Sequence, residues 1–307
     1  MAAIITTGSL PKLLWPGIKD IHGVEYSQHP RIYPQLFETV SSDKAWEEYA
    51  VATGFIAAAQ KPQGQSMVFD DQAQGPTTRL INQTYALGYI VTMEEIQDNL
   101  YEKVSKTRAK ANAISMVQAK ELNLHLIYNR AVTAGYIGAD GVVLGSTAHT
   151  LQGGGTYANR PVAGAMLNEA SLEDALISIM GFTDDKGLLI GVKPKSLIVP
   201  RQQTYQATRL LKSMYQPGTG NNDINAIMAT NALPGGQVTS VYLTNPNMWF
   251  IRTDAGNSGY GMIYQERMAL EFNEDNDFTT KNFMAGSVER YAAGWDDARG
   301  LWVTPGP

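Results

Sequence analysis

An amphipathic pattern extends over residues 92–134, which contain neither glycine nor proline. Thr92 and Glu95 have the spacing of an N-terminal capping box, and Gly135 is suited to ending a helix. We therefore predict one helix over this range. Its apolar positions recur every three or four residues and form one narrow stripe: Met93, Ile96, Leu100, Val104, Thr107, Ala111, Ile114 and Val117.

The predicted helix is too long for a compact chain of 307 residues. At 1.5 Å per residue it would span roughly 60 Å, whereas a compact chain of this size has a diameter of about 50 Å. Either the helix breaks or other subunits cover the part that protrudes. A coiled coil is not indicated, because Lys110, Gln118 and Glu121 interrupt any heptad seam.

A two-residue period precedes the helix. Residues 66–71 predict a short strand, residues 72–76 a turn and residues 77–91 a second strand. One face of the second strand carries Ile81, Tyr85, Leu87, Tyr89 and Val91. Because a two-stranded ribbon is marginal alone in water, we expect it to rest on another surface.

The first 60 residues predict an irregular arm and then a short helix. Residues 1–40 mix prolines and glycines with scattered large apolar side chains, which is too broken for long elements and too apolar for a solvated tail. Residues 41–60 predict a helix capped by Ser42 or Asp43. An arm of this composition also needs a surface to lie on.

The second half predicts a compact mixed part and a closing hairpin. Helices are predicted at residues 171–182 and 202–214, and strands at residues 196–199, 238–243 and 248–252. Residues 262–272 and 278–291 then predict a long hairpin. The order of elements is that of an α+β chain without repeats, and it does not match a doubly wound enzyme.

The charge and the absence of cysteine narrow the functional classes. A net charge of −5 argues against tight, sequence-specific binding of nucleic acid, which usually needs a basic face. The chain has no cysteine and therefore no disulfides or thiolate sites, which is compatible with a reducing compartment. No apolar run approaches the length of a membrane span. We expect a chain that is soluble and cytosolic when made.

The candidate chemical groups do not form a catalytic or metal-binding pattern. His22 and His29 are seven residues apart among prolines, a poor spacing for a shared metal ion. Ser146 and His149 lack the strand, turn and helix that hold a serine nucleophile. Adjacent aspartates are more typical of turns and caps than of an acid–base pair. Three such pairs occur: Asp70 with Asp71, Asp184 with Asp185, and Asp296 with Asp297.

A basic cluster on the predicted helix has two interpretations. Lys103, Lys106, Arg108 and Lys110 form either a solvated face or a contact with an acidic neighbour or with non-specifically held nucleic acid. We favour the solvated face, because exposed helix faces commonly carry such charges. We therefore predict no catalytic residue, no cofactor and no metal ion.

Three segments, in this order, resemble the major capsid proteins of tailed bacteriophages, which have the Hong Kong 97 fold. They are KPQGQSMVFDDQAQGPTTRLINQTYALGYIVTMEEIQDNLY (61–101), LNLHLIYNRAVTAGYIGADGVVLGSTAHT (122–150) and SVERYAAGWDDARGLW (287–302). They are similar to that family's extended loop leading into the spine helix, to the end of that helix, and to the closing peripheral strands. No single segment is diagnostic of the family, and the resemblance rests on all three segments occurring in this order.

The resemblance implies a domain organisation. Residues 1–60 would be the N-terminal arm and short helix, and residues 61–91 the extended loop. Residues 92–166 and 262–307 would form the peripheral domain, with the spine helix at 92–134. Residues 167–261 would form the axial domain, whose loop near residues 217–222 points toward the five-fold and six-fold axes.

The resemblance also implies partners and contact residues. Pentamers and hexamers would build an icosahedral or prolate shell around double-stranded DNA held by non-specific contacts. Either a separate scaffolding protein would assist assembly or the protein would assemble on its own; a portal and a decoration protein would be further partners, and no membrane would be involved. The protein would belong to the virion and pass through the host cytoplasm during assembly. The predicted intersubunit contacts are Asp70, Asp71, Arg79, Tyr85, Leu87, Tyr89, Trp15 and Tyr33, and the predicted axial-loop residues are Pro217, Asn221 and Asn222.

Some members of this family link a lysine of the extended loop covalently to an asparagine of a neighbour. Residues 66–91 contain no lysine and Lys61 would lie at the base of the ribbon, so we predict no such bond. Three alternatives stay open. They are an encapsulin-type shell around cargo enzymes, a polysaccharide-active enzyme using Asp184 or Asp297, and a tail or fibre protein, although no repeats are seen.

Overall fold

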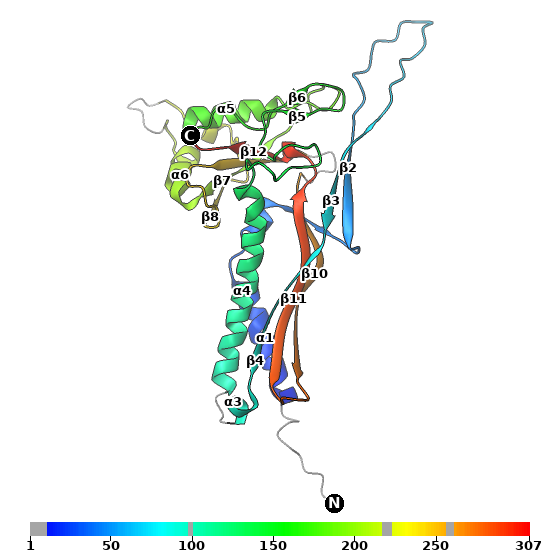
Figure 1. Ribbon diagram of the computed structural model, residues 1–307. Helices are drawn as coiled ribbons and strands as arrows, with labels where there is room; N and C mark the ends of the chain where they lie inside the picture. Colours follow the sequence, from blue (N-terminus) through cyan, green and yellow to red (C-terminus); the bar gives the residue numbers. More distant parts are fainter. Residues whose placement is uncertain (1–10, 98–100, 217–222, 256–260) are drawn as a thin grey trace, which may run out of the picture. The chain divides into compact units, whose positions relative to one another are not determined.

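The computed structural model describes residues 11–97, 101–216, 223–255 and 261–307. Its contacts divide the chain into two units. Unit 1 combines Met1–Arg31, Asn82–Asn123 and Glu266–Ala292, and unit 2 combines Ile32–Ile81, Leu124–Gln265 and Ala293–Pro307. The helices and strands are mixed, as the α+β prediction requires (Figure 1).

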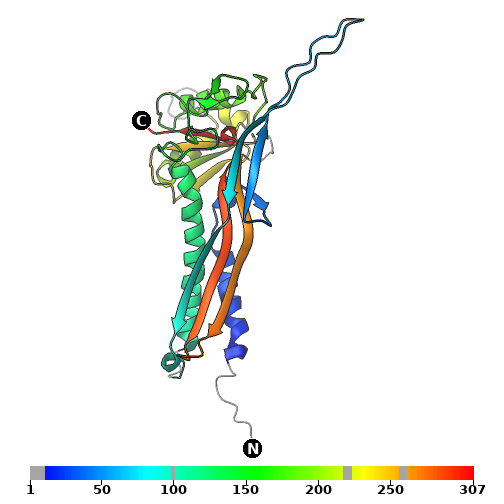
Figure 2. The same cartoon turned by 45° about the vertical axis from the view of Figure 1, so that its right-hand side comes forward.

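Unit 1 contains α1 (Pro11–Gln28), β4 (Gln83–Val91), α3 (Met93–Gln97), and most of α4 (Tyr101–Asn129), β10 (Met262–Asn276) and β11 (Phe283–Trp295). Strands β10, β11 and β4 are neighbours in one sheet, and β11 pairs with β4 in antiparallel register from Phe283 opposite Val91 to Tyr291 opposite Gln83. Figure 2 shows α1 and α4 running along these strands. A small apolar cluster joins Ala109 of α4 to Phe272, Phe283 and Val91 of the sheet.

Two buried polar triads hold α1, α4 and β11 together. In the first, the Nε2 atom of His22 lies 3.0 Å from Oδ1 of Asn112 and 2.9 Å from the hydroxyl of Ser287. Asn112 also donates to the carbonyl of Leu87 over 2.9 Å. Each triad takes one residue from each of the three elements, so polar contacts replace much of the apolar core expected here.

The second triad carries charge. The Lys120 ammonium on α4 lies 2.6 Å from the Glu289 carboxylate on β11, and both side chains are almost fully buried. Tyr26 on α1 donates to Glu289 over 3.1 Å and accepts from Lys120 over 2.8 Å. Burial raises the pKa of Glu289, and the neighbouring Lys120 opposes that rise.

Unit 2 has its core around a four-stranded sheet in the order β12, β9, β7, β8. The strands are β7 (Pro194–Pro200), β8 (Gln237–Ser240), β9 (Trp249–Thr253) and β12 (Leu301–Thr304). Strand β8 runs parallel to β7, whereas β9 is antiparallel to both β7 and β12. Helices α5 (Glu169–Met180) and α6 (Thr204–Lys212) bury their apolar faces in this core, beside Leu197, Trp249 and Trp302.

The remaining elements of unit 2 are short, except for one hairpin. Strands β2 (Trp46–Ala52) and β3 (Gln74–Ile81) pair in antiparallel fashion, with a bulge between Ala50 and Ala52. The others are α2 (Tyr33–Leu36), β1 (Glu38–Ser41), β5 (His149–Thr150), β6 (Thr156–Tyr157), α7 (Ala226–Ala229), and the 3₁₀ helices η2 (Arg201–Gln203) and η3 (Ala298–Gly300).

Several elements of the second half agree with the sequence patterns. The predicted helices at 171–182 and 202–214 correspond to α5 and α6, and the three predicted strands correspond to β7, β8 and β9. Asn168 caps α5 by accepting from the N–H of Ser171 over 2.8 Å. The closing hairpin is present as β10 and β11, with its turn after Asn276. Strand β12 was not predicted, and it joins the sheet of unit 2.

Four predictions for the first half are wrong. Residues 41–60 do not form a helix, because β2 alternates between exposed and half-buried positions and pairs with β3. Residues 66–71 are not a strand, and residues 77–91 are divided between β3 and β4, which pair with different strands. The amino-terminal arm contains an 18-residue helix, α1, which continues across Pro16 and Gly23.

The long helix differs from its prediction in its end and its buried face. Helix α4 ends at Asn129 and not at Ala134, while residues 98–100, where α3 would join α4, lie outside the described residues. One half of the predicted capping box is present, since the N–H of Glu95 donates to the Thr92 hydroxyl over 3.4 Å, whereas the Glu95 carboxylate pairs with Arg108. Of the described residues in the predicted stripe, only Val117 is buried. The face that is buried in unit 1 comprises Ala109, Asn112, Ala113, Met116, Val117, Lys120 and Glu121.

Candidate assembly surfaces

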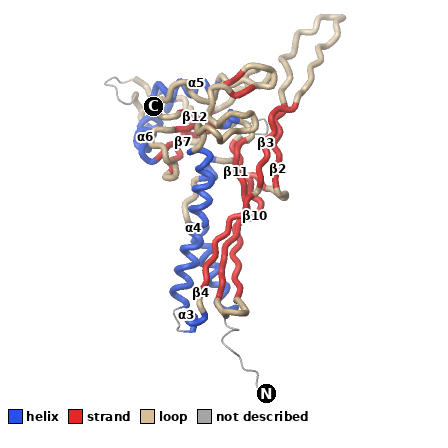
Figure 3. The backbone as a smooth tube through the Cα atoms, in the orientation of Figure 1, coloured by secondary structure: helices blue, strands red, loops and turns tan. Residues whose placement is uncertain are grey.

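The segment between β2 and β3 is the most exposed apolar part of the described chain. Figure 3 shows it as a long loop without strands, extending beyond the hairpin that carries it. Phe69 is 85% exposed, and other large apolar side chains of the loop are more than 40% exposed: Phe55, Ile56, Met67 and Val68. Monomeric proteins rarely leave so many apolar side chains together in water, so this loop is the first candidate for a contact with another subunit.

Asp70 fixes the part of the loop nearest to β2 and β3 within unit 2. Its carboxylate accepts from the N–H of Ile56 over 2.8 Å and pairs with the Lys186 ammonium at 3.2 Å. These contacts lower the pKa of Asp70, the Ile56 N–H being the larger cause. On the other arm of the loop, Gly54 approaches so closely that a Cβ there would lie 2.7 Å from the carboxylate of Asp184. Asp70, predicted as an intersubunit contact, is thus engaged inside its own subunit, although that prediction remains untested.

The side chain of Asp71 is exposed, whereas that of Arg79 is paired within its own hairpin. The carbonyl of Asp71 accepts from Lys186 over 3.4 Å, whereas its side chain is exposed. The Arg79 guanidinium pairs with Glu48 at 2.5 Å and lies 4.4 Å from the centre of the Trp46 ring. These contacts cross the β2–β3 pair, so Arg79 stabilises the hairpin that carries the loop.

Tyr85, Leu87 and Tyr89 lie on β4 in unit 1. The Tyr85 ring is half-buried and stacks on Tyr291, with ring centres 4.4 Å apart. Tyr89 packs against the apolar cluster of unit 1, whereas Leu87 remains 42% exposed. Of the three, Leu87 is therefore the one most available to a neighbouring subunit.

The remaining predicted contact residues lie apart from one another. Trp15 belongs to α1. Tyr33 is only 7% exposed, and its ring lies 4.9 Å from that of Tyr264, so it is a core residue of unit 2. The predicted axial-loop residues Pro217, Asn221 and Asn222 lie outside the described residues.

Lys61 lies at the far end of the loop and not at its base. The turn that reverses the chain follows it directly: the N–H of Gln65 donates to the carbonyl of Pro62 over 3.2 Å, and Gly64 has a φ of 84°. Because Lys61 lies at the tip, its position no longer speaks against a covalent cross-link to a neighbouring subunit. The absence of a cross-link stays a prediction, to be tested by denaturing electrophoresis of assembled particles.

Comparisons with known proteins bear directly on these surfaces. The family model described as phage capsid protein matches residues 77–304, which is well over half of the chain. The chain belongs to the phage capsid protein family. As a major capsid protein it assembles with further copies into the shell of a phage head, and its place is therefore in the virion.

Solved structures place this capsid protein in the Hong Kong 97-like fold. The capsid of an empty GTA particle has a TM-score of 0.56 at 10% identity, covering 89% of this chain and 88% of that one. The virus-like particle from Pyrococcus furiosus has a TM-score of 0.53 at 9% identity, covering 94% and 98%. Mycobacterium phage Adephagia gives 0.51 at 12% identity, covering 91% of each chain. No curated protein sequence matches.

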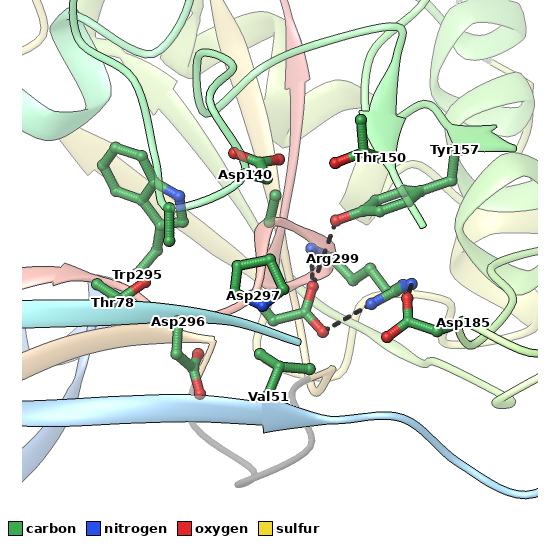
Figure 4. A pocket seen from close by; sticks show the side chains of 13 residues that line it. Val51, Thr78, Asp140, Thr150, Tyr157, Asp185, Trp295, Asp296, Asp297 and Arg299 are labelled. Atoms are coloured by element: carbon green, nitrogen blue, oxygen red, sulfur yellow. Dashed lines mark hydrogen bonds and ion pairs between the residues drawn. The ribbon is translucent and has the colours of Figure 1, made fainter. Parts of the chain in front are cut away.

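In this capsid protein, a cluster of ion pairs underlies the small pocket of Figure 4. Arg299 lies between two buried aspartates, with its nitrogens 3.0 Å from Asp297 and 3.2 Å from Asp185. Burial, reinforced by Asp297, raises the pKa of Tyr157, whose ring lies against Arg299. Asp297 also caps η3 by accepting from the N–H of Arg299 over 2.8 Å. The cluster therefore fixes the start of β12 in the sheet of unit 2.

The carboxylates named for an enzymatic alternative are used in turns. Asp184 accepts from the N–H groups of Lys186 and Leu188 at 2.9 and 2.8 Å, and Asp297 has the cap and ion pair described above. Both behave as the turn preferences of aspartate predict. Among the described residues, no group of three or more histidine, cysteine, aspartate or glutamate side chains is placed to hold a metal ion.

Two residues of the basic cluster of α4, Arg108 and Lys110, are paired with acids of their own unit. Arg108 binds Glu95 at 3.0 Å, and Lys110 binds Glu25 of α1 at 3.3 Å. These pairs support the solvated, internally balanced face over a nucleic-acid contact. In the part of the chain that is described, none of the helices combines the length and apolarity that a membrane crossing needs.

Two groups of residues important for this subunit were missed from the sequence. The exposed loop side chains are predicted in regular elements, Met67, Val68 and Phe69 in a short strand and Phe55 in a helix, because the runs around them satisfy those patterns equally well. Asn112 and Lys120 of the buried polar triads lie off the predicted apolar stripe of the long helix, because polar residues on a helix usually face solvent. Gly54, Pro62 and Gly64 argue against a helix in the β2–β3 loop, whereas the run Ala57 to Ala59 favours one.

Proposed function

We propose that this capsid protein forms pentamers and hexamers that build an icosahedral or prolate head around double-stranded DNA. The β2–β3 loop of each subunit lies on the next subunit of the shell. The observation that carries this proposal is the group of exposed apolar side chains on the loop, with Phe69 85% exposed. Burial of such side chains supplies about 25 cal/mol per Å².

Shared burial accounts for cooperative assembly without a single tight contact. Obligate interfaces bury on the order of 2,000–5,000 Å² in total, and only the surplus over the ordering cost appears as affinity. A subunit with several such contacts stays dissociated below a threshold concentration and closes into a shell above it. The further partners of this proposal are a separate scaffolding protein, a portal and a decoration protein, and assembly takes place in the host cytoplasm.

The net charge of −5 supports a container that holds DNA without binding it tightly. The pairing of Arg108 and Lys110 with acids of unit 1 points the same way. Contacts with packaged DNA are therefore expected to be non-specific and sensitive to salt.

Sedimentation and negative-stain microscopy test the proposal. The purified protein, alone or with a scaffolding partner, is expected to form rings of five or six subunits or closed shells. Particles isolated from the producing host should protect double-stranded DNA from nuclease. A stable monomer under all these conditions would contradict shell formation. Particles filled with a cargo protein and free of DNA would contradict the phage-head function and favour the encapsulin alternative.

A further inference from the structure

A pocket in unit 2 holds an arginine that has no partner. The pocket has a volume of about 400 Å³ and lies between α5, the segment from Ala158 to Ala165, and the end of the chain at Trp302 and Thr304. Arg160 is half-buried, and its Nε atom is buried without a hydrogen-bond partner. In the described part of the chain no ion pair or hydrogen bond reaches its guanidinium, although Asp174 lines the same pocket.

The backbone around Arg160 is held in place. The side-chain amide nitrogen of the neighbouring Asn159 lies 2.7 to 3.0 Å from the carbonyls of Leu144, Ala298 and Leu301, and its two N–H groups are shared among them. The carbonyl of Asn159 accepts from the N–H of Val303 over 2.9 Å. The pocket is therefore formed before any partner arrives, which lowers the entropic cost of binding.

The residues that line the pocket favour a ligand that combines an apolar side chain with a negative charge. Its walls include Pro161, Ala165, Ala175 and Trp302, and Val162, which also lines it, is 91% exposed. A half-buried guanidinium without a partner is costly, and a carboxylate compensates it best through paired, charge-assisted hydrogen bonds. The matching ligand is a peptide with a large apolar residue close to an aspartate or glutamate.

The loop between β2 and β3 carries this combination. In an extended chain, residues two apart face the same side, about 7 Å from one another. Phe69 and Asp71 are both exposed, while Asp70 between them turns back to Lys186. The Asp71 carboxylate has no partner among the described residues. One side of the loop thus offers a phenyl ring and a free carboxylate together.

The other highly exposed phenylalanine does not fit as well. Phe278 is 87% exposed, but the Lys281 ammonium lies 4.4 Å from its ring centre. The adjacent Asp277 accepts from Thr279 and Thr280 within its own turn, and these hydrogen bonds lower its pKa. Both groups are already satisfied inside the β10–β11 turn.

We propose that Phe69 and Asp71 of one subunit dock into the Arg160 pocket of a second copy of this chain. The phenyl ring enters the apolar part of the pocket, and the carboxylate of Asp71 pairs with the guanidinium of Arg160. The inference rests on the proposed shell function, because it names a contact between neighbours in a ring. Loop and pocket are different surfaces of the same unit, so the contact is head-to-tail and closes into a ring when the rotation permits.

Charge exchange tests the pairing. Arg160→Glu and Asp71→Arg are each expected to raise the protein concentration needed for assembly about tenfold, as the loss of a desolvated charge pair does. The double variant carrying both changes restores the pair in reverse and should assemble within about threefold of the wild type. Arg160 makes no hydrogen bond or ion pair in the described chain, so thermal unfolding of the dissociated subunit should be nearly unchanged.

Matched controls separate this contact from general charge effects. Asp174→Asn removes a charge from the same pocket without removing the pair and should assemble no worse than the wild type. Arg201→Glu reverses an exposed cation of unit 2 that does not line the pocket, and it should also assemble normally. Single variants that assemble like the wild type, or a double variant no better than the singles, would overturn the proposal.

Cross-linking supplies an independent test, because the chain has no cysteine of its own. Gln72→Cys protein is mixed with Val162→Cys protein and treated with a short bismaleimide after assembly. A dimer-sized adduct is expected, and Val241→Cys, an equally simple change at another exposed valine, should give none. Assembled shells without the adduct would overturn the contact and leave the shell function standing. If the wild type forms neither rings nor shells even with a scaffolding partner, the shell function itself fails.

Discussion

Lys120 and Glu289 show how a buried charge pair takes the place of apolar packing in unit 1. Their atoms are 2.6 Å apart, their side chains are 4% and 1% exposed, and Tyr26 binds both. Taking two charges out of water is costly, and the pair repays that cost only while both partners and their hydrogen bonds are present. The position of α1 against α4 and β11 thus depends on single polar side chains.

Replacing Lys120 with methionine tests this dependence. The change leaves Glu289 buried without its cation, so the free energy of unfolding should fall by about 3–5 kcal/mol. Urea unfolding of the dissociated subunit measures the loss. The double variant Lys120→Met with Glu289→Leu removes both charges and should recover most of it. A single variant that costs under about 1 kcal/mol would show that water already screens the pair.

Glu274 in β10 makes the stability of the subunit depend on pH. Burial raises its pKa from 4.5 to about 7, and the positive charge of Lys19 opposes the rise only in part. Because the folded-state pKa is the higher one, the stabilisation is complete below about pH 4.5 and is lost as the pH rises through about 7. Above that range the folded subunit has to hold an ionised, partly buried carboxylate.

The variant Glu274→Gln should remove this part of the pH dependence. We expect its melting temperature to exceed that of the wild type at pH 8 and the difference to shrink toward pH 4.5. Melting curves of both proteins at half-unit pH steps give the difference directly. His22, whose pKa is lowered by burial, titrates in both proteins and cancels in the comparison. Parallel profiles from pH 4.5 to 8 would show that Glu274 is not perturbed.

The β2–β3 loop is the element whose change should separate folding from assembly. Met67→Asp with Val68→Asp adds two charges at positions that are 62% and 66% exposed. The dissociated subunit should keep its fold, because both side chains face water there. Assembly should stop, because these charges would have to be buried in the shell. Circular dichroism and sedimentation give the two readouts.

The control for the loop variant is Val241→Asp, a charge at a 60% exposed valine outside the loop, which should assemble. Equal assembly of the loop variant and this control would remove the loop from the interface. Loop positions are a cleaner choice than Tyr85, because aspartate at Tyr85 would also disturb the stacking on Tyr291 inside unit 1.

Local signals made some elements predictable from the sequence and hid others. The amphipathic period of α5 and the short apolar run of β7 that ends at Pro200 made their type predictable, although α5 begins two residues before the predicted Ser171, after its cap at Asn168. The predicted face of α4 is wrong by roughly a third of a turn at 3.6 residues per turn, because Asn112 and Lys120 are buried and the apolar pattern alone cannot show that. The helix predicted at the position of β2 is wrong, because β2 is stabilised by pairing with β3, and a local sequence pattern does not show contacts between segments far apart in sequence.

The candidate contact surface was only partly predictable for a related reason. An apolar run indicates that its side chains are buried. It does not distinguish burial inside the same subunit from burial against a neighbouring one. Tyr33 was expected at an interface and is buried beside Tyr264, whereas Phe69 was expected in a strand and is exposed. Arg160 gave no signal, because its lack of a partner exists only in the folded chain.

At the scale of the whole molecule, a capsid subunit must meet many copies of itself without assembling too early. Each subunit carries a net charge of −5, so like charges oppose the approach of neighbours at low salt. The exposed apolar loop favours the approach, and salt does not weaken that contribution. The balance between the two terms should set the concentration at which assembly begins.

We therefore expect assembly to begin at lower protein concentration as NaCl rises from about 0.05 to 0.5 M, where the screening length falls from roughly 14 to 4 Å. Light scattering across a concentration series measures the threshold. The variant Asp20→Asn with Glu271→Gln removes two exposed carboxylates of unit 1 and changes the net charge from −5 to −3, so its threshold should depend less on salt. A threshold that rises with salt in the wild type would mean that attractive ion pairs between subunits, such as that of Asp71 with Arg160, outweigh the repulsion. In that case Arg160→Glu should lose the salt dependence that Asp20→Asn with Glu271→Gln keeps.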